Sequence, residues 1–148
     1  MPGKPTTIFR ASLGPKLYRD IEIGATEYLR DLAEAIVSAF DFDLDHAYGL
    51  YSKLTGNYGH SPKKYELFAD MGEGDSDDLG VENTPIATAF PRVGAKMLFL
   101  FDYGDDWRFK VEVIGVGEKV PRGRYPKVIA AVGDAPIQYP PYDEDGEE

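Results

Sequence analysis

The strongest chemical signal in the sequence is a short acidic turn, Asp102-Tyr103-Gly104-Asp105-Asp106-Trp107. Carboxylates held this close repel one another, and a bound divalent cation or a shared proton relieves the repulsion. Asp102, Asp105 and Asp106 are therefore candidates for a metal-assisted hydrolase, joined by His46 if the fold brings it near. The alternative is an ordinary turn, in which aspartates supply hydrogen bonds and Trp107 fills the core. Turns ordinarily contain Asp and Gly, and this favours the second interpretation.

Other patterns of catalytic residues are incomplete. The chain has no cysteine and only two histidines, His46 and His60, which excludes thiolate chemistry and imidazole-rich metal sites. Ser61 follows His60, but no G-x-S-x-G motif is present, and Gly115-Val116-Gly117 lacks the third glycine of a dinucleotide turn. We therefore expect a non-enzymatic binding or interaction module, for which the ten tyrosines are suitable contact residues. No cofactor is expected, apart from a divalent metal if the acidic turn binds one.

The negative charge is concentrated in two segments. The chain has 16 basic and 26 acidic residues, a net charge of −10, and residues 70–82 and 140–148 hold six and five acids without a base. This balance disfavours nucleic acid, because a phosphate backbone needs a positive footprint. We therefore expect an unknown protein or small molecule as partner. Residues 108–127 hold six bases and two acids, a pattern that suits either an anion site or a strand face of alternating charge.

The length and the apolar content predict one domain. The chain has 148 residues, of which 43% are hydrophobic, and we assign residues 1–139 to a single domain and 140–148 to a disordered acidic tail. No apolar run reaches the length of a membrane helix, and the first residues lack the apolar core of a signal peptide. A cytoplasmic protein without membrane contact is the expectation.

Periodicity predicts the secondary structure. An apolar stripe from Leu29 to Phe40 has the 3.6-residue period of a main helix of about fifteen residues, with Thr26 as its N-cap. Thr84-Pro85 predicts a short helix that continues to about Phe90. Strands are expected at residues 6–13, 17–23, 47–54, 64–69, 96–103, 107–113 and 127–132. The predicted fold class is α+β, with a mixed or mainly antiparallel sheet packed against one main helix and one short helix.

The segment Phe101–Trp107 resembles the signature Tyr-Asp-Phe-Gly-Asp-x-Trp-x-His of the plasmid pRiA4b ORF-3-like family. Further family segments resemble Tyr18-Arg19-Asp20-Ile21, Ala39-Phe40 followed by Asp45-His46, and Arg124-Tyr125-Pro126. The resemblance implies an α+β fold and a link to open reading frames carried on plasmids and, as passengers, in transposable elements. An accessory role in a mobile element is therefore a further alternative.

This chain departs from the family pattern at two histidines. Phe109 stands in place of the signature histidine, and Tyr48 in place of the second His of a His-Leu-His segment. We expect Phe109 to pack in the core, because it alternates with Trp107 and Val111. The candidate binding residues are Asp102, Asp105, Asp106, Trp107, His46, Arg124 and Tyr125, and no metal ligand is assigned among them.

Overall fold

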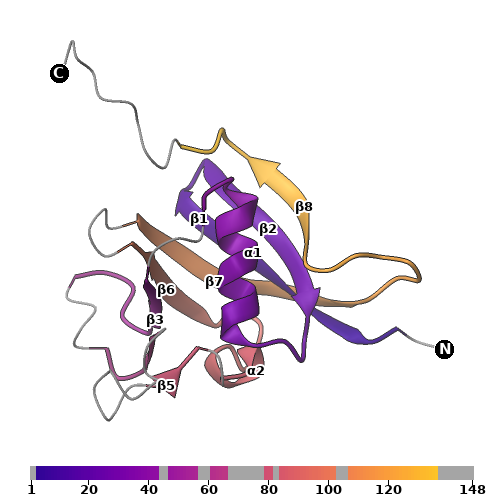
Figure 1. Ribbon diagram of the computed structural model, residues 1–148, viewed down its shortest axis with the longest axis horizontal. Coiled ribbons are helices and arrows are strands. Elements are labelled where there is room, and N and C mark those ends of the chain that lie inside the picture. Colours follow the sequence, from indigo (N-terminus) through magenta and orange to yellow (C-terminus); the bar gives the residue numbers. More distant parts are fainter. Residues whose placement is uncertain are drawn as a thin grey trace.

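The computed structural model describes residues 3–43, 47–56, 61–66, 79–81, 84–102 and 107–136. The expected tail at 140–148 and most of the acidic segment 70–82 lie outside these ranges. The described strands form one eight-stranded sheet in the order β5-β4-β3-β6-β7-β1-β2-β8, and helix α1 crosses one of its faces (Figure 1). Only the β4–β5 pair is parallel among the described pairings. The expected α+β class with a mainly antiparallel sheet is confirmed.

Two helices accompany the strands in the described part of the chain. The elements in chain order are β1 (Pro5–Gly14), β2 (Leu17–Gly24), α1 (Leu29–Ala39), β3 (Tyr48–Tyr51), β4 (Lys64–Glu66), β5 (Leu79–Gly80), α2 (Ile86–Ala89), β6 (Lys96–Phe101), β7 (Trp107–Glu118) and β8 (Lys127–Val132). Strand β3 is shorter than the predicted strand 47–54, and the predicted strand 64–69 is described only as far as residue 66.

Helix α1 buries the predicted apolar stripe against the sheet. Leu29, Leu32 and Ile36 are fully buried. The helix begins at Leu29, with Tyr28 as its N-cap, so the predicted cap at Thr26 was wrong by two positions. The physical reason is Asp31, whose carboxylate accepts a hydrogen bond of 3.0 Å from the backbone N–H of Tyr28 and so fixes the first turn there.

Helix α2 is a single turn that packs Ile86 into the core. Its N-cap is Pro85, and the prediction of Thr84 was wrong by one residue. The hydroxyl of Thr84 donates instead to the carbonyl of Gly80, which ties α2 to the end of β5. Within the described ranges, no helix has the length and apolar character needed to cross a membrane.

Strand β7 is the longest element and reaches Glu118, five residues past its predicted end at Val113. The alternating pattern stops at Gly115 and Gly117, since glycine has a low strand propensity. Pairing with β1 nevertheless keeps this stretch extended, with Gly115 opposite Ile8. Twelve residues at the usual rise per residue span about 40 Å.

The two faces of the sheet carry different side chains. The face beneath α1 holds an aromatic core, in which Phe109 is fully buried and its ring lies 4.9 Å from that of Phe40. This burial confirms the packing role expected for Phe109. The opposite face carries a smaller apolar cluster of Tyr51, Leu98 and Leu100.

Candidate functional site

The predicted site residues divide between the two ends of β7. Asp102 follows β6 and Trp107 begins β7, whereas Arg124 and Tyr125 lie in the connection from β7 to β8. The length of β7, about 40 Å, separates these two groups, so they do not form one site. The remaining candidates, Asp105, Asp106 and His46, lie outside the described residues.

Asp102 and Trp107 flank the acidic turn and are both held by the protein interior. Asp102 is 6% exposed and has a left-handed backbone with φ 63°, and its backbone N–H donates to the carbonyl of Ala47 at 3.0 Å. Aspartate tolerates this conformation better than most residues. Trp107 is half-buried and packs against the main core. These contacts account for packing at the turn, while ligand binding by the turn stays a prediction.

A metal site is not formed by the described residues alone. In residues 3–43, 47–56, 61–66, 79–81, 84–102 and 107–136, no three His, Cys, Asp or Glu side chains are grouped so that they could hold a metal ion. Because Asp105, Asp106 and His46 are outside these ranges, the metal-assisted hydrolase stays a prediction.

Tyr125 organises the connection between β7 and β8. Its hydroxyl accepts a hydrogen bond of 2.9 Å from the backbone N–H of Val120. Its ring lies 5.6 Å from the ammonium of Lys119 and 4.8 Å from that of Lys127, both within cation–π range. Arg124 is exposed beside it. Tyr125 precedes Pro126 through a cis peptide bond, and Pro126 lines a groove on the helix side of the sheet.

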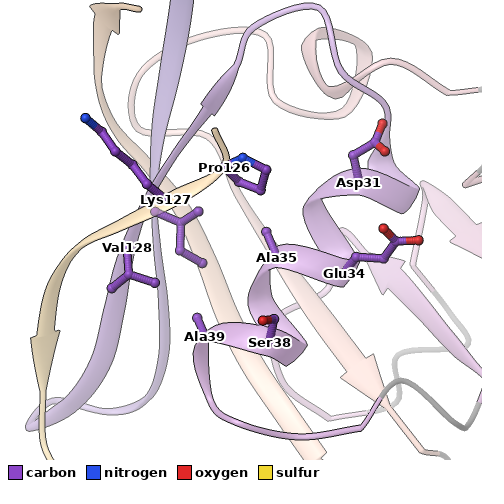
Figure 2. A pocket seen from close by; sticks show the side chains of 9 residues that line it. Asp31, Glu34, Ala35, Ser38, Ala39, Pro126, Lys127 and Val128 are labelled. Atoms are coloured by element: carbon purple, nitrogen blue, oxygen red, sulfur yellow. The ribbon is translucent and has the colours of Figure 1, made fainter. Parts of the chain in front are cut away.

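This groove lies between α1 and β8 (Figure 2). It has a volume of about 250 Å³. Its lining residues come from β2, α1 and the start of β8, and they are Ile21, Asp31, Glu34, Ala35, Ser38, Ala39, Pro126, Lys127 and Val128. Small-molecule sites usually measure about 300–1,000 Å³. The α1–β8 groove therefore suits one amino-acid side chain better than a whole cofactor.

Small residues on α1 create the groove. Ala35 and Ala39 are one turn apart on the side of α1 that faces β8 (Figure 2). Their methyl groups leave space that larger side chains would fill. Val128 supplies exposed apolar surface across from them, and its pairing partner in β2, the buried Ile21, also lines the groove. Val128 is 47% exposed, so this apolar surface is only partly covered.

Carboxylates line the helix side of the groove. Asp31 and Glu34 line the groove from α1, and Figure 2 shows their carboxylates on the side of Ala35 away from Val128. Glu34 lies 4.0 Å from Arg30, but both side chains are about half exposed, and such pairs contribute little. The ammonium of Lys127 points away from the helix, towards the Tyr125 ring. The groove thus combines an apolar interior with a negative rim on α1.

Strand β8 carries further exposed apolar side chains, of which Val132 pairs with Tyr18 and lies on the sheet face opposite the groove. Val128, Ile129 and Val132 are 47%, 45% and 37% exposed on this edge strand. The pairing with β2 shifts between Asp20 and Ile21, which leaves Ile129 without an opposite residue. A bulge of this kind twists an edge strand and disfavours the addition of a long further strand. Side-chain contacts in the groove are therefore a better basis for binding here than backbone pairing.

Sequence reasoning did not identify the α1–β8 groove. Its lining contains none of the candidate residues, although Tyr125 immediately precedes Pro126. The available signal was the four-residue spacing of Asp31, Ala35 and Ala39 beside the apolar stripe. That spacing indicates a helix face of small residues, but it cannot indicate which strand lies opposite.

Comparisons with known proteins relate the chain to one family and one fold. A family model described as plasmid pRiA4b ORF-3-like protein matches residues 10–140. The structure is similar to the crystal structure of a protein of unknown function, MM3350, from Methanosarcina mazei Go1, with a TM-score of 0.71 and 18% identity over 93% of this chain and 74% of that chain. At this identity the similarity shows a shared fold alone. The comparison with curated proteins gives no significant match.

Proposed function

The chain belongs to the plasmid pRiA4b ORF-3-like protein family, and we propose that this member is a non-enzymatic binding module. In this proposal the α1–β8 groove receives a lysine or arginine side chain of a protein or peptide partner. The observation that carries it is the combination of an apolar interior with the carboxylates of Asp31 and Glu34 on one rim. Lysine and arginine match this pattern because each joins a long apolar stem to a cationic head.

The expected energies set the size of the partner. Burying three or four methylene groups contributes about 2–3 kcal/mol, and an exposed ion pair adds about 0.2–1 kcal/mol. These contributions correspond to millimolar affinity at best for an isolated side chain. A physiological partner therefore needs further contacts, for which the exposed Val128 and Ile129 on β8 are available.

The carboxylates at the rim differ in how strongly they are engaged. The Asp31 carboxylate already accepts a hydrogen bond from the backbone N–H of Tyr28. Substitution of Asp31 would therefore also destabilise the start of α1. Among the described residues, Glu34 has only the weak pair with Arg30 at 4.0 Å. Glu34 is therefore the residue at which binding can be changed with little effect on folding.

Random-peptide display tests the proposal. Parallel selections would use the wild type, Glu34→Lys and Glu118→Lys as immobilised targets. Glu118 is exposed at the end of β7, outside the groove lining, so its substitution makes the same charge change elsewhere. We expect wild-type selections to be enriched in lysine or arginine next to apolar residues. The selected peptides should bind Glu34→Lys about tenfold more weakly and Glu118→Lys almost unchanged.

A second variant tests the apolar half of the groove. Ala35→Leu places a larger side chain in the groove without changing charge, and it should weaken the same peptides. Selection of peptides without basic residues, or equal binding to all four proteins, would contradict the proposal.

A further inference from the structure

We propose a second, separate binding site on the sheet face opposite α1, which takes a small organic anion with an apolar body. A cavity of about 480 Å³ lies there. Its lining consists of the end of β1 and the following turn, the segment after β3, and side chains of β6 and β7, namely Ser12, Leu13, Gly14, Pro15, Leu54, Thr55, Gly56, Leu98, Arg108 and Lys110. This volume is within the range of about 300–1,000 Å³ for metabolite-sized ligands.

The strand register places the cavity away from α1. Lys110 is directly opposite Leu98 in β6 and Ser12 in β1, so the three side chains share one face. Leu98 belongs to the small apolar cluster on the face that α1 does not cover. The cavity is therefore independent of the α1–β8 groove, and either site can exist without the other.

The charge of this cavity is opposite to that of the chain. The chain has a net charge of −10, yet the described lining holds Arg108 and Lys110 and no acidic residue. Lys110 is exposed and makes no ion pair with a described residue. Two cations in a concave site attract an anion, and the guanidinium fork matches a carboxylate or a phosphate.

Two hydrogen bonds order the cavity wall, and one of them holds the side chain of Arg108. The guanidinium of Arg108 donates to the carbonyl of Gly56 at 3.3 Å, which connects β7 to the segment after β3. Gly56 has a φ of 76°, a conformation that glycine adopts without strain. The Ser12 hydroxyl donates to the carbonyl of Lys110 at 3.4 Å. Both bonds order the cavity wall around the two charges before a ligand arrives.

The remaining wall indicates the body of the ligand. Leu54 and Leu98 supply apolar surface next to the cations, and Leu54 packs against the small cluster of the same face. Inorganic phosphate would leave the apolar surface of Leu54 and Leu98 exposed to water. An anion with an aromatic or aliphatic body would cover it, at about 25 cal/mol for each Å² removed from water.

Nitrogen–proton correlation NMR with three matched probes tests this site. Phenylacetate and phenyl phosphate carry the anion on one phenyl body, and phenylacetamide is the neutral control. We expect both anions, or one of them, to shift the amides of Leu13, Thr55 and Lys110 at millimolar concentration, with phenylacetamide at least about fivefold weaker. Binding by only one anion would identify the ligand as a carboxylate or as a phosphate ester.

Substitutions decide whether the charges cause the binding. Lys110→Gln should weaken the anions about fivefold. Lys96→Gln should leave them unchanged, because Lys96 is exposed on the same face of β6 but outside the lining. The proposal is overturned if neither anion binds, if the neutral probe binds equally well, if the shifts lie elsewhere, or if both variants behave alike.

Discussion

Phe42 and Trp107 meet edge to face, with ring centroids 4.9 Å apart and an interplanar angle of 64°. Phe42 follows α1, and Trp107 is the first residue of β7. The contact therefore connects the end of the helix to the strand that leaves the acidic turn. Aromatic pairs of this geometry contribute about 0.5–1.5 kcal/mol beyond the area that they bury. A residue of the family signature thus has a structural role that needs no ligand.

Phe42→Ala should strongly destabilise the protein. Phe42 is 6% exposed and lies in the aromatic core, so its truncation should lower the free energy of unfolding by about 3–5 kcal/mol. Trp107 is the only tryptophan, and its emission should shift to longer wavelength as water enters beside the indole. Urea denaturation followed by fluorescence measures both effects. A loss below about 1 kcal/mol with unchanged emission would show that the contact is unimportant.

The ion pair between Arg10 and Asp20 gives a second prediction. Two guanidinium nitrogens of Arg10 donate to the two carboxylate oxygens of Asp20, at 2.8 and 3.0 Å. The side chain of Asp20 is 8% exposed and that of Arg10 is 39% exposed, so solvent screens the pair only in part. Asp20→Ala should lower the free energy of unfolding by about 1.5–3 kcal/mol.

Glu34→Ala is the matched control for this pair. It removes a carboxylate from the exposed pair with Arg30 at 4.0 Å and should change stability by less than about 0.5 kcal/mol. Chemical denaturation of both variants provides the comparison. Equal losses in the two proteins would contradict the difference in burial as the cause.

The burial of Tyr65 leads us to expect a loss of stability in alkali. Burial raises the pKa of Tyr65 above 10.0 because the low-dielectric interior disfavours the phenolate. A tyrosine whose pKa is raised in the folded state contributes to the free energy of unfolding. This contribution is complete below the pKa of the unfolded state, about 10, and is lost as the pH rises through the pKa of the folded state. Tyr65→Phe cannot ionise. Wild-type stability should therefore fall relative to this variant above about pH 10, and a constant difference from neutral pH upwards would contradict the prediction.

Ala35→Leu should separate stability from binding. The added methyl groups enter the α1–β8 groove and cover apolar surface, while leucine keeps a high helix propensity. Thermal unfolding should show a stability that is unchanged or raised by up to about 1 kcal/mol, although peptide binding is weakened. A destabilised variant would mean that the groove wall cannot accommodate the larger side chain.

The sequence was sufficient for the parts of the fold that depend on local pattern. The buried stripe of α1 was predicted from its 3.6-residue period, and β6 was predicted from a continuous apolar run. Helix ends were less accurate, since Asp31 and Thr84 form contacts that composition does not specify. The extension of β7 past Val113 depends on pairing with β1, a long-range interaction that overrides the low strand propensity of Gly115 and Gly117.

The candidate site was harder to predict for a physical reason. The acidic turn can be recognised from the sequence because its residues are adjacent. The α1–β8 groove, in contrast, joins residues nearly a hundred positions apart. Strand order determines that β8 lies next to β2 and therefore beside α1. Nothing in the alanines at positions 35 and 39 indicates that order. The basic cavity of the opposite face likewise depends on the register of β1, β6 and β7.

The most direct measurement of the central claim is a set of intermolecular nuclear Overhauser effects to a lysine side chain in the α1–β8 groove. The probe is N-acetyl-lysine amide at millimolar concentration, with N-acetyl-norleucine amide as the uncharged analogue. The account predicts contacts from the lysine methylenes to the methyl groups of Ala35, Ala39 and Val128, weaker contacts from the norleucine analogue, and loss of the lysine contacts in Glu34→Lys. Lysine contacts to other parts of the surface only, or contacts that Glu34→Lys retains in full, would contradict it.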